Sequence, residues 1–365
     1  MRQGVLGTWG RRLPLASSME LSLGEGDTPL LEAKNFCARH GLEIKLYVKF
    51  EGMNPTGSFK DRGMVLAVAA AKAKGMRATL CASTGNTSAS AAAYSARAGM
   101  ASIVLVPEGK ISRAKLLQAA ACGAQVIEMA GNFDDAMRAV QRLVQVFPLA
   151  LVNSVNPYRL QGQKTAAFEV AQALGKMPDM HALPVGNAGN ISANWLGYLE
   201  WTGRQAQGYP AVDESYAIYP ETAGTLPKML GYQAAGAAPL VQGAPVLEPQ
   251  TVASAIRIGA PQSAHLAQAV RQASGGWFVA VEDREILWAQ RALAESEGIF
   301  CEPASAASVA GIVKDFRGGK IAEGALVVAT LTGHGLKDPD AVEMTGRRLF
   351  AEDEKALFQI MEKAL

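Results

Sequence analysis

The chain has 365 residues, of which 49% are hydrophobic and 19% are charged, and its formal net charge is +2. This balance is typical of a globular protein that is long enough to bury a large core and to form two domains. No basic run and no alternation of basic with aromatic residues stands out, so nucleic acid is not an expected partner. The longest apolar runs are too short to cross a bilayer, so a membrane is not an expected partner either.

The cysteines and histidines are scattered along the chain, four of each. They form no C-x-x-C pair and no spacing typical of metal ligands, so we expect no metal site. Reduced, buried thiols in a cytoplasmic protein explain this pattern. The arginines near the N-terminus are followed by no apolar segment, and we expect no secretory signal.

Strands and helices are predicted to alternate along most of the chain. In the first part, the residue pattern predicts strands at 42–50, 77–82, 101–106, 125–129 and 149–153, and helices at 64–74, 89–98, 112–122 and 132–146. Farther along, it predicts strands at 182–185, 215–219 and 325–331 and helices at 191–201, 282–296 and 305–316, whereas residues 221–255 show no clear pattern. Alternation at such short intervals is typical of an α/β fold with open, mostly parallel sheets and crossover helices.

The first loop of chemical interest is N-P-T-G-S-F-K-D-R-G at 54–63, between a predicted strand and a predicted helix. Lys60 therefore lies near the first turn of that helix, and Thr56 or Ser58 can cap the helix N-terminus. The helix N-terminus and partial desolvation disfavour the ammonium form of such a lysine. A neutral amine is what a Schiff base to an aldehyde requires. The alternative is an ordinary first-turn lysine that points into water.

Two further loops have the composition of anion-binding sites. Residues 186–190, G-N-A-G-N, follow a strand and open a helix, so backbone N–H groups and the helix N-terminus can face a phosphate. The loop is neither a Walker loop nor G-x-G-x-x-G, and the alternative is a plain tight turn. Residues 83–88, S-T-G-N-T-S, offer hydroxyls and an amide to a carboxylate. The alternative there is helix capping by Ser83 or Thr84.

Two more polar clusters follow predicted strands. Arg159, in N-S-V-N-P-Y-R-L at 153–160, can bind an anion in a bidentate manner, although a lone arginine is more often a surface residue. Thr332, in T-G-H-G-L-K at 332–337, can bond a ring nitrogen without carrying charge, whereas we expect a structural role for His334. Ligands of an open parallel sheet bind beyond the carboxyl ends of its strands. The loops at 54–60, 83–88, 186–190 and 332–337 are therefore expected to converge on one site.

These motifs together resemble the threonine synthases, a family of fold-type-II pyridoxal-phosphate enzymes related to the tryptophan synthase β subunit. The resemblance extends from about residue 24 to residue 338 and rests on G-D-T-P-L (26–30), N-P-T-G-S-F-K-D-R-G (54–63), S-T-G-N-T-S-A (83–89), N-P-Y-R-L-Q-G-Q-K-T (156–165), G-N-A-G-N (186–190), E-P-A-S-A-A (302–307) and T-G-H-G-L-K-D (332–338). It implies a homodimer whose active site lies at a domain cleft. The smaller, mobile domain would span 56–154, and the larger domain would comprise 1–55 plus 155–365.

The resemblance also implies roles for individual residues. Lys60 would form the Schiff base with pyridoxal 5'-phosphate and take the α-proton of the substrate. The remaining cofactor ligands would be Asn86 at the 3-hydroxyl, Gly186, Asn187, Ala188, Gly189 and Asn190 at the phosphate, and Thr332 at the ring nitrogen. The substrate carboxylate would be bound by Ser83, Thr84, Asn86 and Thr87, and its phosphate by Ser154, Arg159 and Asn187.

The reaction implied is the conversion of O-phospho-L-homoserine and water to L-threonine and phosphate, by β,γ-elimination and hydration. The nearest alternative is a threonine or serine dehydratase. The asparagines of the 186–190 loop favour threonine synthase, because the dehydratases typically have a run of glycines there. A lyase acting on phosphoserine or phosphosulfolactate, a non-catalytic pyridoxal-phosphate-binding protein and a nucleotide-binding α/β protein remain further alternatives.

Overall fold

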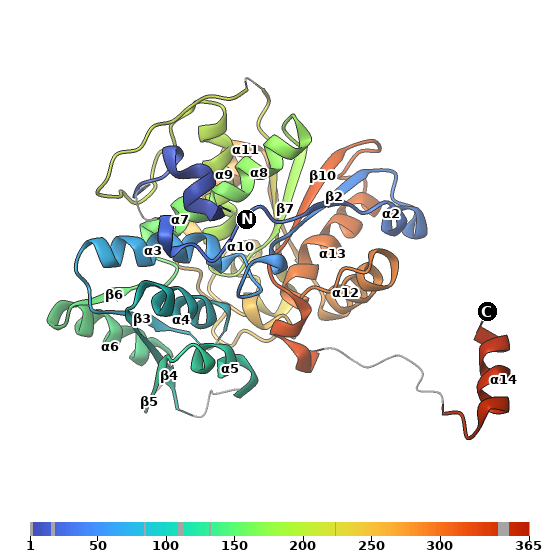
Figure 1. Ribbon diagram of the computed structural model, residues 1–365. Coiled ribbons are helices and arrows are strands. Elements are labelled where there is room, and N and C mark those ends of the chain that lie inside the picture. Colours follow the sequence, from blue (N-terminus) through green and yellow to red (C-terminus); the bar gives the residue numbers. More distant parts are fainter. Residues whose placement is uncertain are drawn as a thin grey trace.

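The computed structural model describes residues 3–15, 19–83, 85–108, 113–130, 133–222, 224–341 and 350–364. Two β-sheets organise this part of the chain, one with six strands and one with four. Figure 1 shows the four-stranded sheet at the lower left and the six-stranded sheet above it and to its right. This is the open, mostly parallel α/β arrangement that the alternation of strands and helices predicted.

The larger sheet has the strand order β1-β2-β10-β7-β8-β9. Strand β1 pairs antiparallel with β2, and all other neighbours are parallel. The strands span Leu30–Glu32 (β1), Lys45–Phe50 (β2), Met180–Pro184 (β7), Lys228–Ala234 (β8), Trp277–Val281 (β9) and Leu326–Leu331 (β10).

The smaller sheet has the order β5-β4-β3-β6 and is parallel throughout. Its strands span Ala78–Ala82 (β3), Ala101–Pro107 (β4), Gln125–Met129 (β5) and Leu149–Leu151 (β6). The whole sheet lies inside the range 56–154 expected for the smaller domain, although the division into domains stays a prediction.

Helices cover both sheets and connect their strands. They span Gly4–Trp9 (α1), Lys34–His40 (α2), Lys60–Ala73 (α3), Asn86–Ala98 (α4), Arg113–Ala121 (α5), Phe133–Val146 (α6), Pro157–Gln163 (α7), Thr165–Leu174 (α8), Gly189–Trp201 (α9), Pro239–Gln242 (α10), Ala264–Ser274 (α11), Asp283–Glu297 (α12), Pro303–Arg317 (α13) and Glu354–Ala364 (α14). None of the described helices is long and apolar enough to cross a membrane.

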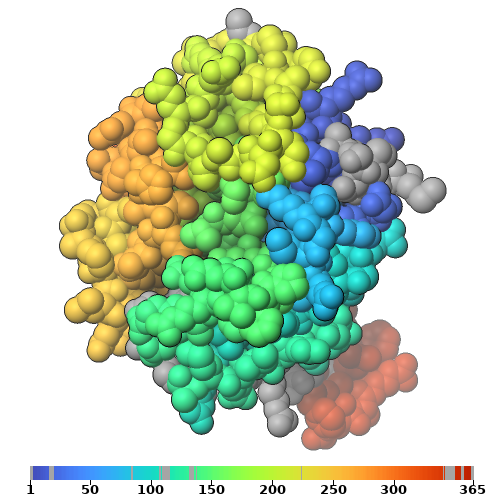
Figure 2. All heavy atoms as spheres, turned by 90° about the vertical axis from the view of Figure 1, so that its left-hand side faces the viewer, coloured from blue at the N-terminus to red at the C-terminus, as the bar shows by residue number. Residues whose placement is uncertain are grey.

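Helix α3 occupies the centre of the fold. Residues 64–71 are each at most 3% exposed, and the helix packs against both α7 and α4. It has apolar residues on all sides because it is covered on all sides. Seen from the left of Figure 1, the molecule has a hollow between the green half below, which carries the four-stranded sheet, and the yellow-green and orange segments above (Figure 2).

Most predicted elements are present, and two details were wrong. Residues 215–219 form no strand, whereas β8 lies in the region that showed no clear pattern. The expected cap of α3 is also absent in its usual form, because the Thr56 hydroxyl donates to Asp61 (2.6 Å) instead. Ser58 Oγ accepts only a long bond of 3.4 Å from the Lys60 N–H.

Candidate active site

The strand orders place a crevice beyond the carboxyl ends of both sheets. In the smaller sheet the chain continues from β3 to β4 on one side, whereas β6 returns on the other. In the larger sheet β8 lies on one side of β7 and β10 on the other. Ligands bind at such reversal points. The loops after β3, β6, β7 and β10 are therefore those that should carry functional groups.

The loop that carries Lys60 is joined to the loop after β10 by backbone hydrogen bonds. The Phe59 N–H donates to the Thr332 carbonyl (2.9 Å), and the His334 N–H donates to the Gly57 carbonyl (2.9 Å). Gly57 has φ +84°, and a Cβ there would lie 3.2 Å from Cδ of Lys337. The structure thus brings Lys60, the first residue of α3, next to the loop of Thr332, as expected.

Lys60 lies in an environment that favours the neutral amine. Burial, assisted by the nearby Arg159 cation, lowers its pKa to about 7, and Glu302 opposes the shift. Its ammonium group makes no ion pair within the described chain and lies 4.0 Å from the centre of the Phe59 ring. An amine that titrates near neutrality can act both as a nucleophile and as a general base.

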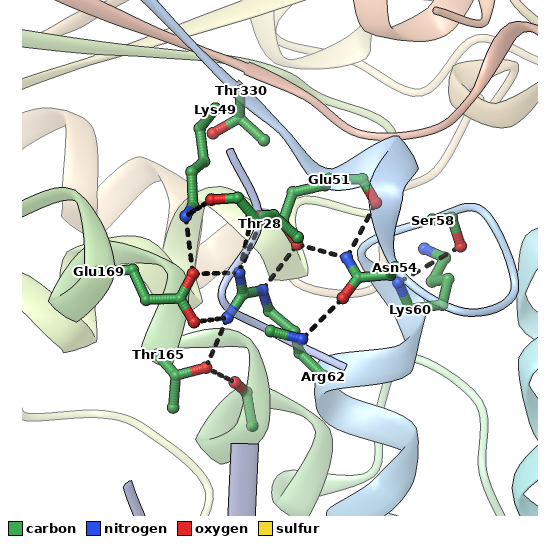
Figure 3. A network of polar contacts seen from close by, with 12 residues as sticks. Thr28, Lys49, Glu51, Asn54, Ser58, Lys60, Arg62, Thr165, Glu169 and Thr330 are labelled. Atoms are coloured by element: carbon green, nitrogen blue, oxygen red, sulfur yellow. Dashed lines mark hydrogen bonds and ion pairs between the residues drawn. The ribbon is translucent and has the colours of Figure 1, made fainter. Parts of the chain in front are cut away.

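A buried ionic network fixes the start of α3 (Figure 3). Arg62 Nε donates to Glu51 (2.6 Å), and its Nη2 donates to Glu169 (2.6 Å). Lys49 Nζ donates to the same Glu169 oxygen (2.6 Å). Burial alone would raise the pKa of Glu51 and of Glu169, but Arg62 and Lys49 together outweigh burial and hold both pKa values below their ordinary range. Breaking such a pair costs about 3–5 kcal/mol, so Arg62 holds Lys60 two residues away in place.

Arg159 is a buried cation with hydrogen-bonding capacity to spare. Its side chain is 1% exposed; Nη1 donates to the Val152 carbonyl (3.2 Å), and Nε has no partner. Burial lowers its pKa only to about 10, so the group is charged at neutral pH. Burying a charged guanidinium with a donor that has no partner costs free energy, and a bound anion would offset that cost. The alternative of a surface arginine is excluded.

The loop at 186–190 presents donors to an anion. Ala188, with φ +65°, precedes Gly189, the first residue of α9, whose first N–H groups have no acceptor inside the helix. Asn194 Nδ2 donates to Asn190 Oδ1 (3.2 Å), which leaves the buried Asn190 Nδ2 without a partner and free to donate. Gly186 is packed closely, because a Cβ there would lie 3.1 Å from Cα of Ile256.

Asn86 and Thr332 meet at a buried carboxyl group. Asn86, the first residue of α4, donates through Nδ2 to both oxygens of Glu302 (3.0 and 3.2 Å). Thr332 Oγ1 lies 3.0 Å from Ser305 Oγ and 3.4 Å from Glu302 Oε1. The structure therefore brings together these two predicted ligands, which lie more than two hundred residues apart in the sequence.

The remaining predicted residues lie around the same crevice. Ser154 Oγ donates to Gln262 Oε1 (2.6 Å), and the Gln262 N–H donates to Asn187 Oδ1 (3.4 Å), so Ser154 and Asn187 are linked through one residue. Ser83 Oγ accepts the Gly85 N–H (3.3 Å), and Thr87 is partly exposed in the first turn of α4. Thr84 lies outside the described residues.

Three residues of this site had been assigned no role: Glu302, Gln262 and Asn194. Glu302 was visible in the E-P-A-S-A-A motif, but nothing local indicates where its side chain points. Gln262 and Asn194 belong to no motif, and only the three-dimensional arrangement brings them to the site. His334 has the expected structural role, because its ring stacks on Phe50 with centroids 6.1 Å apart.

Comparison with known proteins identifies the family. The family model described as "Pyridoxal-phosphate dependent enzyme" matches residues 21–333. The threonine synthase of Mycobacterium leprae (strain TN) is 53% identical over 339 residues, which cover 92% of this chain and 89% of that protein. The chain belongs to the threonine synthase family of pyridoxal-phosphate-dependent enzymes. The threonine synthase of Synechocystis (strain PCC 6803) is 48% identical over 100% of this chain and 91% of its own length.

Solved structures of other enzymes share the fold. Maize serine racemase aligns with a TM-score of 0.70 at 19% identity, over 97% of this chain and 98% of that chain. The processed form of threonine deaminase isoform 2 from Solanum lycopersicum aligns with a TM-score of 0.68 at 19% identity, over 92% of this chain and 83% of that chain. The predicted fold class is therefore confirmed, and so is membership of the threonine synthases, which are lyases of threonine biosynthesis.

The residues present fit the family's cofactor. A low-pKa lysine amine suits an aldehyde, and the donor-rich 186–190 loop with its unpartnered Asn190 amide suits a phosphate. The neutral Thr332 hydroxyl and the Asn86 amide suit a pyridine ring that carries a hydroxyl group. Arg159 and Ser154 lie outside this set.

Proposed function

We propose that the chain converts O-phospho-L-homoserine and water to L-threonine and phosphate. The relatives are named threonine synthases, which supports this reaction. The main structural support is Arg159, a buried, charged side chain near Lys60 whose Nε has no hydrogen-bond partner. An amino-acid substrate with a phosphate at its far end needs an anion site separate from the one that holds the cofactor phosphate. Arg159, Ser154 and Asn187 supply that second site.

The roles of the cofactor-binding residues follow from their donors and charges. Lys60 would bond the aldehyde carbon, Asn86 would donate to the 3-oxygen, and Thr332 would face the ring nitrogen. The loop of Gly186, Asn187, Ala188, Gly189 and Asn190 binds the phosphate. When bound, pyridoxal phosphate supplies an electron-withdrawing ring that stabilises the electron pair left on the substrate when a proton departs.

The substrate is held at both of its charged ends. Ser83, Thr84, Asn86 and Thr87 bind the carboxylate at the N-terminus of α4, where the helix dipole also favours negative charge. Arg159, with Ser154 and Asn187, binds the phosphate through charge-assisted hydrogen bonds. Fixing both ends orients the α- and β-carbons toward the Lys60 amine.

Lys60 moves the protons. Once the amino group of the substrate has taken its place on the cofactor, the Lys60 amine, whose pKa burial lowers to about 7, would be free to accept the α-proton of the bound substrate. Loss of a β-proton would let phosphate leave from the γ-carbon, which then gains a proton to become the methyl group. Water would add its hydroxyl at the β-carbon, and return of a proton from Lys60 to the α-carbon would complete L-threonine. Because Thr332 carries no charge, it does not stabilise a protonated ring nitrogen as an aspartate would.

The same proposal extends to the organisation of the protein. We infer that residues 56–154 form a smaller mobile domain and that residues 1–55 and 155–365 form the larger one. The Asn86–Glu302 and Ser154–Gln262 hydrogen bonds cross this boundary and would stabilise a closed arrangement. A homodimer is proposed from the family resemblance, and a cytoplasmic location from the free thiols of Cys37, Cys81, Cys122 and Cys301.

A coupled assay tests the reaction. The purified protein, loaded with pyridoxal phosphate, is given O-phospho-L-homoserine, and both products are measured. Equal amounts of phosphate and L-threonine are expected, and Lys60→Ala should abolish both. Formation of a 2-oxo acid and ammonia instead of threonine would show the dehydratase reaction and contradict the proposal.

A further inference from the structure

Glu302 is a buried acid whose position the stability of the fold does not explain. It is 3% exposed, and within the described chain no lysine or arginine forms an ion pair with it. It occupies the N-cap position of α13, yet its side chain makes no capping hydrogen bond. Serine, threonine, asparagine and aspartate are the residues that stabilise this position. Burial raises the pKa of this carboxyl group, and Lys337 and Lys60 oppose the rise without forming an ion pair with it. A carboxyl group held in this way and turned away from its own helix points to function.

The carboxyl group contacts two residues from different parts of the chain. Asn86 Nδ2 donates to both of its oxygens at 3.0 and 3.2 Å, and Thr332 Oγ1 lies 3.4 Å away. Space for it is provided by Gly333, where a Cβ would lie 2.6 Å from Cδ of Glu302. The backbone also fixes its position, because the Glu302 N–H donates to the Gly333 carbonyl (3.0 Å).

The chemistry of a carboxyl group determines how Asn86 is oriented. Both carboxyl oxygens lie within hydrogen-bonding distance of Asn86 Nδ2, and at least one of them accepts whether or not the group is protonated, so the Asn86 amide turns its NH₂ group, and not its oxygen, toward Glu302. An NH₂ group has two hydrogens. One hydrogen bonds Glu302, and the other is left to donate to a second acceptor on the open side of the crevice. Without Glu302, the amide could rotate and present its oxygen there.

We propose that Glu302 is a positioning residue of the cofactor site, which orients the Asn86 amide so that it donates to the 3-oxygen of pyridoxal phosphate. The inference rests on the proposed role of Asn86. Residues that face the ring nitrogen and the 3-oxygen flank one edge of the pyridine ring. A carboxyl group that contacts both Asn86 and Thr332 lies along that edge.

Two conservative substitutions at Glu302 separate the effect of side-chain length from the effect of an ionisable group. Glu302→Gln keeps an oxygen at the same distance from Asn86 but removes the charge. Glu302→Asp keeps the charge but is one methylene too short to maintain the contact. The dissociation constant of pyridoxal phosphate from cofactor-free protein should change less than about threefold in the Gln variant. In the Asp variant it should rise about tenfold or more, as loss of a carboxylate hydrogen bond predicts.

A double-mutant cycle tests whether Glu302 acts through Asn86. Once Asn86→Ala is present, Glu302→Asp should weaken cofactor binding by less than about threefold more, because the amide to be oriented is gone. Combined with Asn190→Ala, the matched control at the cofactor phosphate, Glu302→Asp should keep its full effect. The visible absorbance maximum of the bound cofactor should shift in the Asp variant and not in the Gln variant.

The inference would be overturned if Glu302→Asp bound the cofactor as tightly as wild type. It would also be overturned if the Gln variant were the weaker binder, or if the effects of Glu302→Asp and Asn86→Ala simply multiplied. Unfolding temperatures check that each variant is folded. If the Asp variant is not, Glu302→Leu, which removes the acceptor oxygens, takes its place, with the same expected loss of cofactor affinity and the same cycle with Asn86→Ala. Because cofactor binding is measured, failure of the proposed reaction in the phosphate assay would be a separate result.

Discussion

Lys60 and Arg159 are two cations that share one buried environment, and the charge of Arg159 disfavours the ammonium form of Lys60. Burial lowers the pKa of both, to about 7 for Lys60 and to about 10 for Arg159. The two side chains therefore differ in protonation state at neutral pH. Arg159 keeps its charge for an anion, whereas Lys60 can lose its proton and act as a nucleophile or base.

The lowered pKa of Lys60 makes the stability of the cofactor-free protein depend on pH. The unfolded chain keeps this proton up to about pH 10.4, whereas the folded chain loses it near pH 7. The unfolded state binds more protons between these values, so the contribution of Lys60 to stability rises with pH across this range. Lys60→Met should therefore be more stable than wild type at pH 6, on the order of 5 kcal/mol.

Urea unfolding at pH 6 and pH 9 checks this prediction. The advantage of Lys60→Met should shrink as the pH rises, whereas Lys72→Met, an exposed position on the same helix, should show no such trend. An advantage that stayed constant from pH 6 to pH 9 would mean that Lys60 keeps its proton in the folded protein.

Arg159→Ala should mainly weaken binding of the phosphorylated substrate. Loss of a charge-assisted hydrogen bond predicts an increase in KM of about 10- to 100-fold. L-threonine, which lacks the phosphate, serves as the control ligand, and its affinity should change little. Steady-state kinetics and a spectral titration measure the two quantities. Equal losses for both ligands, or an unchanged KM, would remove Arg159 from the phosphate site.

At the level of elements, the position of these two residues depends on the contact between α3 and α7. The helices meet at two glycines. A Cβ on Gly63 would lie 2.6 Å from the Arg159 carbonyl oxygen, and a Cβ on Gly162 would lie 1.9 Å from the Arg62 carbonyl oxygen. No larger residue fits unless the helices separate. Because α3 begins with Lys60 and α7 carries Arg159, separating them would displace both functional groups.

Gly162→Ala should therefore destabilise the protein and reduce its activity together. Overpacking at such a contact costs about 1–3 kcal/mol. Urea unfolding measures the loss, and kcat/KM for O-phospho-L-homoserine should fall at least about tenfold, because small displacements of reacting groups are costly. Gly224→Ala, at an exposed glycine with no atom closer than 4.0 Å to the added Cβ, is the control. Wild-type behaviour of Gly162→Ala would show that the helix contact tolerates a methyl group.

The elements also show where sequence reasoning works and where it fails. Strands β3, β4 and β10 were predicted within one or two residues, because buried parallel strands are short apolar runs bounded by turns. Residues 215–219 have the composition of a strand, but the Tyr216 hydroxyl donates to Glu200 (2.9 Å), and the Tyr219 carbonyl accepts from Arg12 (2.6 Å). These tertiary contacts override the local propensity.

Strand β8 is the opposite case, a strand whose composition did not predict one. It contains Gly231, which is unfavourable in a strand by itself. The structure explains the glycine, because a Cβ there would lie 2.3 Å from the ring of Phe278 on β9. This requirement comes from a residue far along the chain, and no local pattern reveals it.

At the scale of the whole molecule, the site depends on joining two sheets through side chains that are distant in sequence. The loops at strand ends could be predicted because parallel topology gathers them at one edge. The Glu302–Asn86 and Gln262–Ser154 hydrogen bonds could not, since they depend on how the halves pack. The Arg62 network is of the same kind: its ions come from β2, α3, α8 and the turn after β2.

The covalent attachment of the cofactor to Lys60 is the claim on which the other roles depend. Reducing the loaded protein with borohydride makes a Schiff base permanent, and peptide mass spectrometry then locates it. We expect a phosphopyridoxyl group on the peptide that contains Lys60, and none on that peptide in Lys60→Ala. A label on another lysine, or a colourless protein that takes up no pyridoxal phosphate, would contradict this account.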